Sequence, residues 1–148
     1  CVSANRVNLI QFNRTKNFRK YTSWPMEYKA LIDTPSFQLL PTGVGGVLYP
    51  PKAIDGITLD KATIIKCCLD TDDLWLKMNV VRKGMKTVVP RDFVLPKTIE
   101  GSQETALWKQ NVYKTGNDEA LKNIIKAFVD LDLDADSIIE KIRKDRFV

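Results

Sequence analysis

The sequence predicts a single domain of the α/β or α+β class, in which helices flank an open mixed sheet. Short apolar or alternating segments bounded by glycine and proline predict strands, and longer segments with helical periodicity alternate with them along the chain. The composition agrees, since 44% hydrophobic and 28% charged residues in a chain of 148 are typical of a globular domain. No apolar run approaches the roughly 18 residues that a transmembrane helix needs.

The predicted strands are short, and glycine or proline bounds most of them. Residues 5–12 alternate loosely, residues 36–40 lead into a glycine-rich loop, and "GGVLYPP" resumes as a strand that ends at the prolines. "MKTVVP" and "DFVLP" predict two more strands, each broken by a proline. These segments supply the expected sheet.

The predicted helices have recognisable ends. Residues 59–70 form a broadly apolar helix, and Thr71 is the expected N-cap of the next one, which ends at Gly84. Asn117 caps a third helix, and "DSIIEKIRKDRF" predicts a last one. We therefore expect residues 118–148 to form a helical C-terminal part of the single domain 1–148.

Cysteine and histidine usage excludes several classes of chemistry. The chain has three cysteines, Cys1, Cys67 and Cys68. An odd number does not fit a disulfide framework, and their spacing does not fit a zinc site. We expect the adjacent pair to be buried thiols. Histidine is absent, which excludes Ser-His-Asp and Cys-His catalysis. Acid–base chemistry must then come from carboxylates, lysine or tyrosine.

The net charge of +5 is confined to one segment. Residues 1–30 hold six basic side chains and one acidic one, while the other residues carry equal numbers of each sign. The basic stretch "NRTKNFRKYTSWP" also interleaves Phe18, Tyr21 and Trp24. Such a segment could hold phosphates of a nucleic acid, an anionic membrane or a nucleotide-linked substrate, or be a solvated loop.

The stretch "PTGVGGVLYPP" concentrates glycine and proline. It matches neither the dinucleotide-binding fingerprint nor the P-loop in spacing or context. Consecutive glycines allow a backbone to approach a ligand closely and leave N–H groups free to bond it. The alternative is a glycine-rich hairpin without a ligand.

Aspartates cluster at a predicted helix start in "DTDDLWLK". Close carboxylates push the pKa values of one another apart, so one of Asp70, Asp72 and Asp73 could act as a general base. The helix dipole explains the same residues as caps without chemistry. A second acidic run, Asp130 to Asp136, lacks the glycine and glutamate of a calcium-binding loop and predicts a solvated linker between helices.

Taken in order, these stretches resemble a known family. "TGVGGVLYPP", then "DTDDLWLK", then "GNDEAL" resemble the C-terminal half of bacterial glycosyltransferases of capsular and cell-surface polysaccharide synthesis, similar to the glycosyltransferase-A type fold. The resemblance covers residues 1 to 128, and the basic stretch ending in "SWP" is similar to the family segment that precedes the glycine motif.

The resemblance implies transfer of a sugar from a nucleotide-sugar donor to a hydroxyl of a glycan acceptor. It implies that the loop with Thr42, Gly43, Gly45 and Gly46 lines the sugar pocket, and that Asp72 and Asp73 are catalytic. Asp72 is the expected base and Asp73 the orienting or capping residue, with the two roles exchangeable. Trp75 is either a stacking platform for substrate or core, with core favoured. Arg6 and the cluster Arg14 to Lys20 are expected to face the donor diphosphate on grounds of charge.

The resemblance also implies a Mg²⁺ or Mn²⁺ ion held by an Asp-x-Asp motif at the end of an early strand, and no such motif precedes Arg6. The chain lacks an initiator Met and opens on a strand-like segment, so we expect it to be the C-terminal part of a larger glycosyltransferase domain, inactive alone. No metal ligand is assigned within it.

The expected partners are a nucleotide-sugar and a glycan acceptor, without nucleic acid. The expected location is the cytoplasm, with peripheral contact at the inner face of the membrane left open, as are the oligomeric state, the sugar, the linkage and the stereochemical course. Two alternatives remain: a polyanion- or nucleic-acid-binding module that uses residues 13–24, and a folded fragment without activity.

Overall fold

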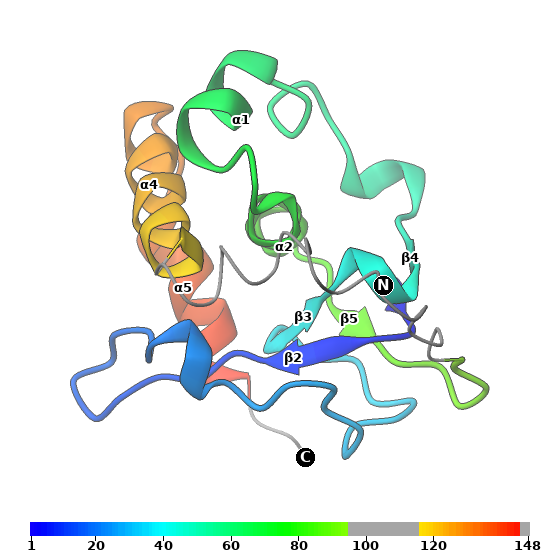
Figure 1. The fold of residues 1–148 in the computed structure, drawn as a ribbon. Coiled ribbons are helices and arrows are strands. Elements are labelled where there is room, and N and C mark those ends of the chain that lie inside the picture. Colours follow the sequence, from blue (N-terminus) through cyan, green and yellow to red (C-terminus); the bar gives the residue numbers. More distant parts are fainter. Residues whose placement is uncertain (95–115, 146–148) are drawn as a thin grey trace, which may run out of the picture.

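The computed structural model describes residues 1–94 and 116–145, and in these ranges the fold is of the α+β type, with small sheets packed against helices (Figure 1). The strands are β1 (Val2–Ala4), β2 (Val7–Leu9), β3 (Leu39–Pro41), β4 (Val47–Leu48) and β5 (Thr87–Val88). The helices are α1 (Lys61–Cys67), α2 (Asp72–Arg82), α4 (Gly116–Asp130) and α5 (Ala135–Lys144). Single 3₁₀ turns lie at Tyr21–Ser23, Gly43–Gly45 and Pro51–Ala53.

The strands form two sheets in place of one. In the first, β1 lies between β4, which is antiparallel to it, and β5, which is parallel, so this sheet is mixed as expected. In the second, β2 and β3 pair antiparallel. The sequence predicted one strand over residues 5–12, but the chain turns at Asn5 and Arg6 and passes from the first sheet to the second.

The reason for this turn lies in partners distant in sequence. The Asn5 Nδ2 donates to the Gly45 carbonyl oxygen at 2.9 Å, and the Thr42 N–H donates to the Arg6 carbonyl oxygen at 3.0 Å. The glycine loop therefore pairs with the backbone between β1 and β2. The strand expected at "DFVLP" does not form over its described residues 92–94, where Phe93 lies in a turn closed onto Pro90, and the rest of it lies outside the described residues.

The helix ends follow local signals. The Asp60 carboxylate caps α1 by accepting from the Thr63 N–H at 3.1 Å. The helix predicted over 59–70 ends earlier, at Cys67, because Cys68 takes an extended φ of −158°. Thr71 is the N-cap residue of α2, as predicted, although its side chain makes no capping hydrogen bond. Gly84 follows the end of α2 with a φ of +71°, which suits glycine.

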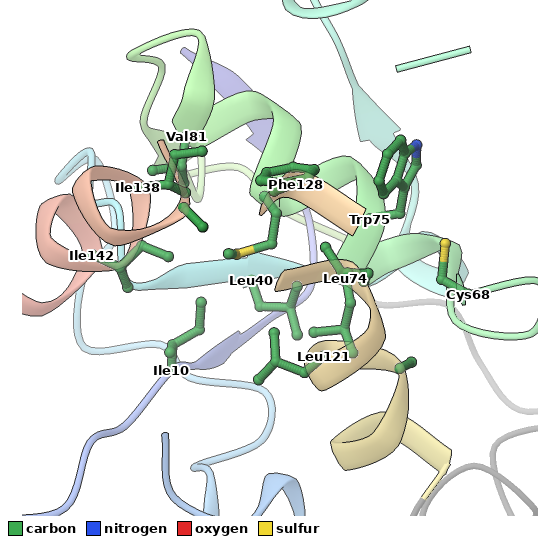
Figure 2. Close-up of a cluster of buried hydrophobic side chains, with 14 of the residues drawn as sticks. Ile10, Leu40, Cys68, Leu74, Trp75, Val81, Leu121, Phe128, Ile138 and Ile142 are labelled. Carbon is green, nitrogen blue, oxygen red and sulfur yellow. The ribbon is translucent and has the colours of Figure 1, made fainter. Parts of the chain in front are cut away.

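Helix α2 is the centre of the molecule. It contacts β3, α4 and α5, and Figure 1 shows these elements around it. The largest apolar cluster joins Leu74, Trp75 and Val81 of α2 to residues of α4 and α5, and Figure 2 shows Phe128, Ile138 and Ile142 among them. Trp75 packs edge-on against Phe128 at 5.5 Å between ring centroids. The position of the N-terminus of α2 is thus set by a packed core.

A charged side chain of α2 is enclosed in the protein. Lys77 of α2 is 1% exposed, and its Nζ donates to Thr87 Oγ1 of β5 at 3.2 Å. Burial lowers the pKa of Lys77 to about 7, against a smaller raising effect of the Asp145 carboxylate. The unfolded chain therefore binds more protons than the folded one between about pH 7 and 10, so stability rises with pH across that window.

Lys77→Met should increase the free energy of unfolding at pH 7 by about 1–4 kcal/mol, because methionine keeps the buried methylene packing and removes the charge. The increase of stability between pH 7 and 10 should flatten in the variant. Urea unfolding at pH 6, 7, 8.5 and 10 measures both effects, with exposed Lys66→Met of α1 as the control. A variant less stable than the parent at pH 6 would show that Lys77 stabilises the fold.

Candidate functional site

The glycine loop and the aspartate pair meet in the structure. The Gly43 N–H donates to Asp73 Oδ1 at 2.9 Å, joining residues 30 apart in sequence. Asp73 lies in the first turn of α2, and Gly43 opens the 3₁₀ turn between β3 and β4. The second carboxylate oxygen of Asp73, Oδ2, accepts no hydrogen bond from a described residue. One carboxylate oxygen of Asp73 is thus held by the backbone of the glycine loop.

Glycine occurs at each of these loop positions for a different structural reason. A Cβ on Gly45 would lie 2.7 Å from Arg6 Cβ and 3.0 Å from the Arg6 backbone nitrogen, so no larger residue fits there. Gly46 has a φ of +84°, which favours glycine. A Cβ on Gly43 would lie 3.3 Å from Asp73 Oδ1. The sequence indicated close approach of backbone to a ligand, and the structure shows that at Gly45 the close neighbour is the chain itself.

Arg6 lies beneath this loop and contributes a positive charge to it. Its Nε is 3.3 Å from Glu27 Oε1, an ion-pair contact whose geometry is not that of a hydrogen bond. The Arg6 Nε is buried and has no hydrogen-bond partner in the described part of the chain. Burial raises the pKa of both Asp73 and Tyr21, and the guanidinium charge of Arg6 opposes this increase as a smaller effect, which places Arg6 in the electrostatic environment of the site.

Asp73 has the perturbed pKa of a potential base. Burial raises the pKa of Asp73 to about 6, the negative charge of Asp72 adds to the increase, and the Gly43 hydrogen bond and Arg6 oppose it. A carboxylate with a pKa near 6 is ionised at neutral pH and still basic enough to accept a proton. Asp72 is exposed. Of the two aspartates, Asp73 is the one that the structure brings to the glycine loop.

Two tyrosines lie near the aspartate pair, and only Tyr21 was named from the sequence, as an aromatic of the basic segment. Burial raises the pKa of Tyr49, and the charges of Asp73 and Asp72 raise it further, so this phenol stays protonated. Tyr21 is also half-buried near Asp73 and accepts from Asn8 Nδ2 at 3.1 Å. Tyr49 lies three positions after Gly46, and this nearness to the glycine loop is the sequence signal for its place at the site.

Other predicted site residues serve the fold. Trp75 is 1% exposed, and its Nε1 donates to the Thr58 carbonyl oxygen at 2.8 Å, so it belongs to the core and cannot stack on a substrate. Thr42 is 7% exposed, and its hydroxyl donates to the Arg6 carbonyl oxygen at 3.3 Å. Both residues therefore have structural roles near the site.

The aromatic side chains of the basic segment 13–24 pack against other aromatic rings of the protein. Phe18 packs against Phe12 at 4.6 Å, Tyr21 against Trp24 at 4.9 Å, and Trp24 is 3% exposed. Nucleic-acid binding by base stacking needs open aromatic faces, so these contacts disfavour that interpretation. The cationic side chains that remain exposed are Arg14, Lys16, Arg19 and Lys20.

Metal-binding residues are not gathered in the described ranges 1–94 and 116–145. These ranges contain no group of three or more Cys, Asp or Glu side chains that could hold an ion. In the acidic run, Asp134 caps α5 by accepting from the Ser137 N–H at 2.8 Å, and Asp132 has a φ of +55° in the turn between α4 and α5. These two aspartates have structural roles in the interhelix turn.

The described helices include none whose length and apolar character would let it cross a bilayer.

Comparison with protein-family models, with curated proteins and with solved structures finds no match for this chain. The fold and the site therefore have to be interpreted from their own geometry.

Proposed function

We propose that this chain is the acceptor-side part of a glycosyltransferase that moves a sugar from a nucleotide-sugar to a glycan hydroxyl during surface polysaccharide synthesis. The observation that carries the proposal is the hydrogen bond from the Gly43 N–H to Asp73 Oδ1. This hydrogen bond joins the glycine loop to the aspartate pair, the two motifs on which the family resemblance rests. It also orients the Asp73 carboxylate, whose pKa of about 6 suits a general base.

In the proposed mechanism Asp73 is the base. The acceptor hydroxyl oxygen attacks the anomeric carbon, and Asp73 Oδ2 takes the hydroxyl proton as the bond to the nucleoside diphosphate breaks. The products are the extended glycan, the nucleoside diphosphate and a protonated Asp73, which releases its proton to solvent. The sequence favoured Asp72 for this role, but Asp73 is the aspartate that accepts from the Gly43 N–H, and the charge of Asp72 contributes to raising the pKa of Asp73.

The donor diphosphate would lie on the side of Arg6, whose guanidinium charge acts on Asp73 by lowering its pKa against the larger effect of burial. A Mg²⁺ or Mn²⁺ ion, when bound to such an enzyme, neutralises charge on the diphosphate. The described residues do not fit its coordination, and no step of the mechanism is assigned to it. A cytoplasmic enzyme with a nucleotide-sugar donor and a glycan acceptor remains our proposal for location and partners.

Titration with UDP-, GDP- and CDP-sugars in the presence of Mn²⁺ tests the function. We expect heat of binding and release of nucleoside diphosphate from the native protein, and less or neither from residues 1–148 alone. Absence of both in both proteins, together with salt-sensitive binding to DNA or RNA, would favour a polyanion-binding module instead.

The pH profile of the transfer tests the base more closely. We expect kcat/KM to rise with pH and to level off above about 6, because Asp73 must be ionised to act. Asp72→Asn removes a charge that raises the pKa of Asp73, so the rise should move to lower pH. Arg6→Gln removes a charge that lowers it, so the rise should move to higher pH. Shifts in one common direction would contradict the assignment.

A further inference from the structure

Part of the basic segment folds as an ordered hairpin, residues 12–20, which we call the basic hairpin. Phe12 and Phe18 form an antiparallel bridge at its base. At its tip the Asn13 N–H donates to the Asn17 carbonyl oxygen at 2.9 Å, and the Asn13 side-chain Oδ1 accepts from the Asn17 N–H at 3.0 Å. A hydrogen-bonded turn therefore sets the positions of the charged residues on this hairpin.

The rest of the protein holds the base of the basic hairpin. The Arg19 N–H donates to the Gln11 carbonyl oxygen at 2.9 Å, and Trp24 Nε1 donates to the Arg19 carbonyl oxygen at 3.1 Å. Just after the hairpin, the Tyr21 N–H donates to Asp118 Oδ1 of α4 at 2.8 Å. Because the backbone is ordered before any partner arrives, binding does not carry the cost of ordering it.

Four exposed cations lie on the basic hairpin without a carboxylate beside them in the sequence. They are Arg14, Lys16, Arg19 and Lys20. None of them forms an ion pair with a carboxylate of residues 1–94 or 116–145, and residues 1–26 include neither Asp nor Glu. The hairpin therefore presents a local positive field that attracts an anionic surface.

The basic hairpin lies apart from the glycine loop. Figure 1 shows the hairpin in blue at the lower left, away from β4 and from the 3₁₀ turn Gly43–Gly45. The sequence suggested that the cluster Arg14 to Lys20 faces the donor diphosphate, but the cation whose charge acts on Asp73 is Arg6. The hairpin is therefore better placed for a different anionic partner.

The class of this partner follows from the aromatic packing and the charge distribution. Single-stranded nucleic acid binds by stacking bases on open aromatic faces, and here Phe18, Tyr21 and Trp24 pack against other rings. A duplex is bound through many phosphates along a basic stripe, whereas the charges outside residues 1–30 balance to zero. A bilayer presents its anionic headgroups in a plane, which a single hairpin can reach, and each Lys or Arg near that plane strengthens binding by about fivefold.

We propose that the basic hairpin docks this protein on the anionic surface of a phospholipid membrane. Arg14, Lys16, Arg19 and Lys20 bind the phosphates of the lipid headgroups, and the contact stays at the level of those headgroups. The docking surface is separate from the Asp73 site, so this proposal does not depend on the proposed sugar transfer.

Sedimentation with lipid vesicles tests the docking. The protein should bind vesicles that contain phosphatidylglycerol, an anionic lipid, and should not bind vesicles of phosphatidylcholine alone. Binding should fall by about tenfold or more between about 0.1 M and about 1 M salt, because the Debye length shortens from about 10 Å to about 3 Å. Equal binding to both kinds of vesicle, or binding to neither, would overturn the proposal.

Arg14→Gln combined with Lys16→Gln should weaken binding to the anionic vesicles by about 20-fold, because it removes two cations of the hairpin. Lys52→Gln combined with Lys61→Gln is the matched control. It removes the same charge from exposed lysines of the 3₁₀ turn Pro51–Ala53 and of α1, segments that lie away from the hairpin in Figure 1.

All four lysine and arginine positions are exposed, so urea unfolding should be nearly the same in both double variants and the parent. Equal weakening of vesicle binding by the two double variants would show that net charge and not the hairpin binds the membrane, and would overturn the proposal.

Two further measurements separate the membrane from other anions. Binding to RNA or duplex DNA that is tighter than binding to the anionic vesicles at the same salt would replace the membrane by nucleic acid. Nucleotide-sugar binding that is lost in Arg14→Gln with Lys16→Gln would assign the hairpin to the donor diphosphate. We expect neither result. Vesicle binding that persists in a protein without sugar transfer would remove the proposed function and retain the docking surface.

Discussion

Asp73→Asn should reduce the turnover of sugar transfer by about 10²–10⁴-fold, the usual contribution of a general base. Asparagine keeps an oxygen that can accept from the Gly43 N–H, so the geometry of the loop should survive. Binding of the nucleotide-sugar should change little. Single-turnover and equilibrium binding measurements separate the two quantities.

The same variant should be more stable than the parent above pH 6. The folded state raises the pKa of Asp73, so the folded chain binds more protons than the unfolded one between about pH 4 and 6, and stability falls as pH rises through that window. Removal of the charge should recover about 1–2 kcal/mol at pH 7. A base kept at the expense of stability is a recurrent feature of active sites.

Asp72→Asn is the matched control, because it changes the neighbouring carboxylate by the same chemistry. We expect it to lower turnover by less than tenfold and to move the pH profile as described above. If Asp72→Asn abolished transfer and Asp73→Asn had turnover similar to that of the parent, Asp72 would be the base and Asp73 an orienting residue.

Gly45→Val should destabilise the protein by about 1–3 kcal/mol or more, since its Cβ would lie 2.7 Å from Arg6 Cβ and 3.0 Å from the Arg6 backbone nitrogen. The Arg6 backbone cannot move without disturbing the turn between β1 and β2. Chemical denaturation measures the loss, and we expect transfer to fall with it because the loop that holds Asp73 shifts.

Gly56→Ala is the control for Gly45→Val. A Cβ on Gly56 meets no atom within 4 Å, so this variant should lie within about 0.5 kcal/mol of the parent. Gly45→Val with the stability of Gly56→Ala would mean that the loop and Arg6 separate readily, and that the close packing does not constrain the site.

Much of the helical structure was predictable because its signals are local. The helix from Thr71 to Gly84 has its acidic first turn and its terminal glycine within the segment itself, and the structure places α2 at Asp72–Arg82. The helix after the expected cap Asn117 was predicted from four apolar residues on one face, and Leu121, Ile124 and Phe128 of α4 are buried, although α4 already includes Gly116 and Asn117 therefore lies inside the helix. Buried thiols at Cys67 and Cys68 were also predicted and confirmed.

The strands were harder, because their partners are distant in sequence. The strand predicted over residues 5–12 is confirmed only at β2 (Val7–Leu9), where Val7 pairs with Pro41, while β1 (Val2–Ala4) lies before the predicted range and pairs with β4 in the other sheet. Nothing within residues 5–12 specifies a change of sheet at Arg6. The change depends on hydrogen bonds from the glycine loop, about which a local pattern carries no information.

The sequence by itself determined which residue types are available for chemistry: no histidine, one basic segment, a glycine loop and an aspartate pair. Only the tertiary structure decided how they are used. In the folded protein, Asp73 and not Asp72 accepts from the Gly43 N–H. Trp75 is buried in the core, and the aromatic side chains of the basic segment pack against one another. The reason is physical, since consecutive helix residues point in different directions and only the packing of α2 against β3, α4 and α5 selects which of them faces the loop.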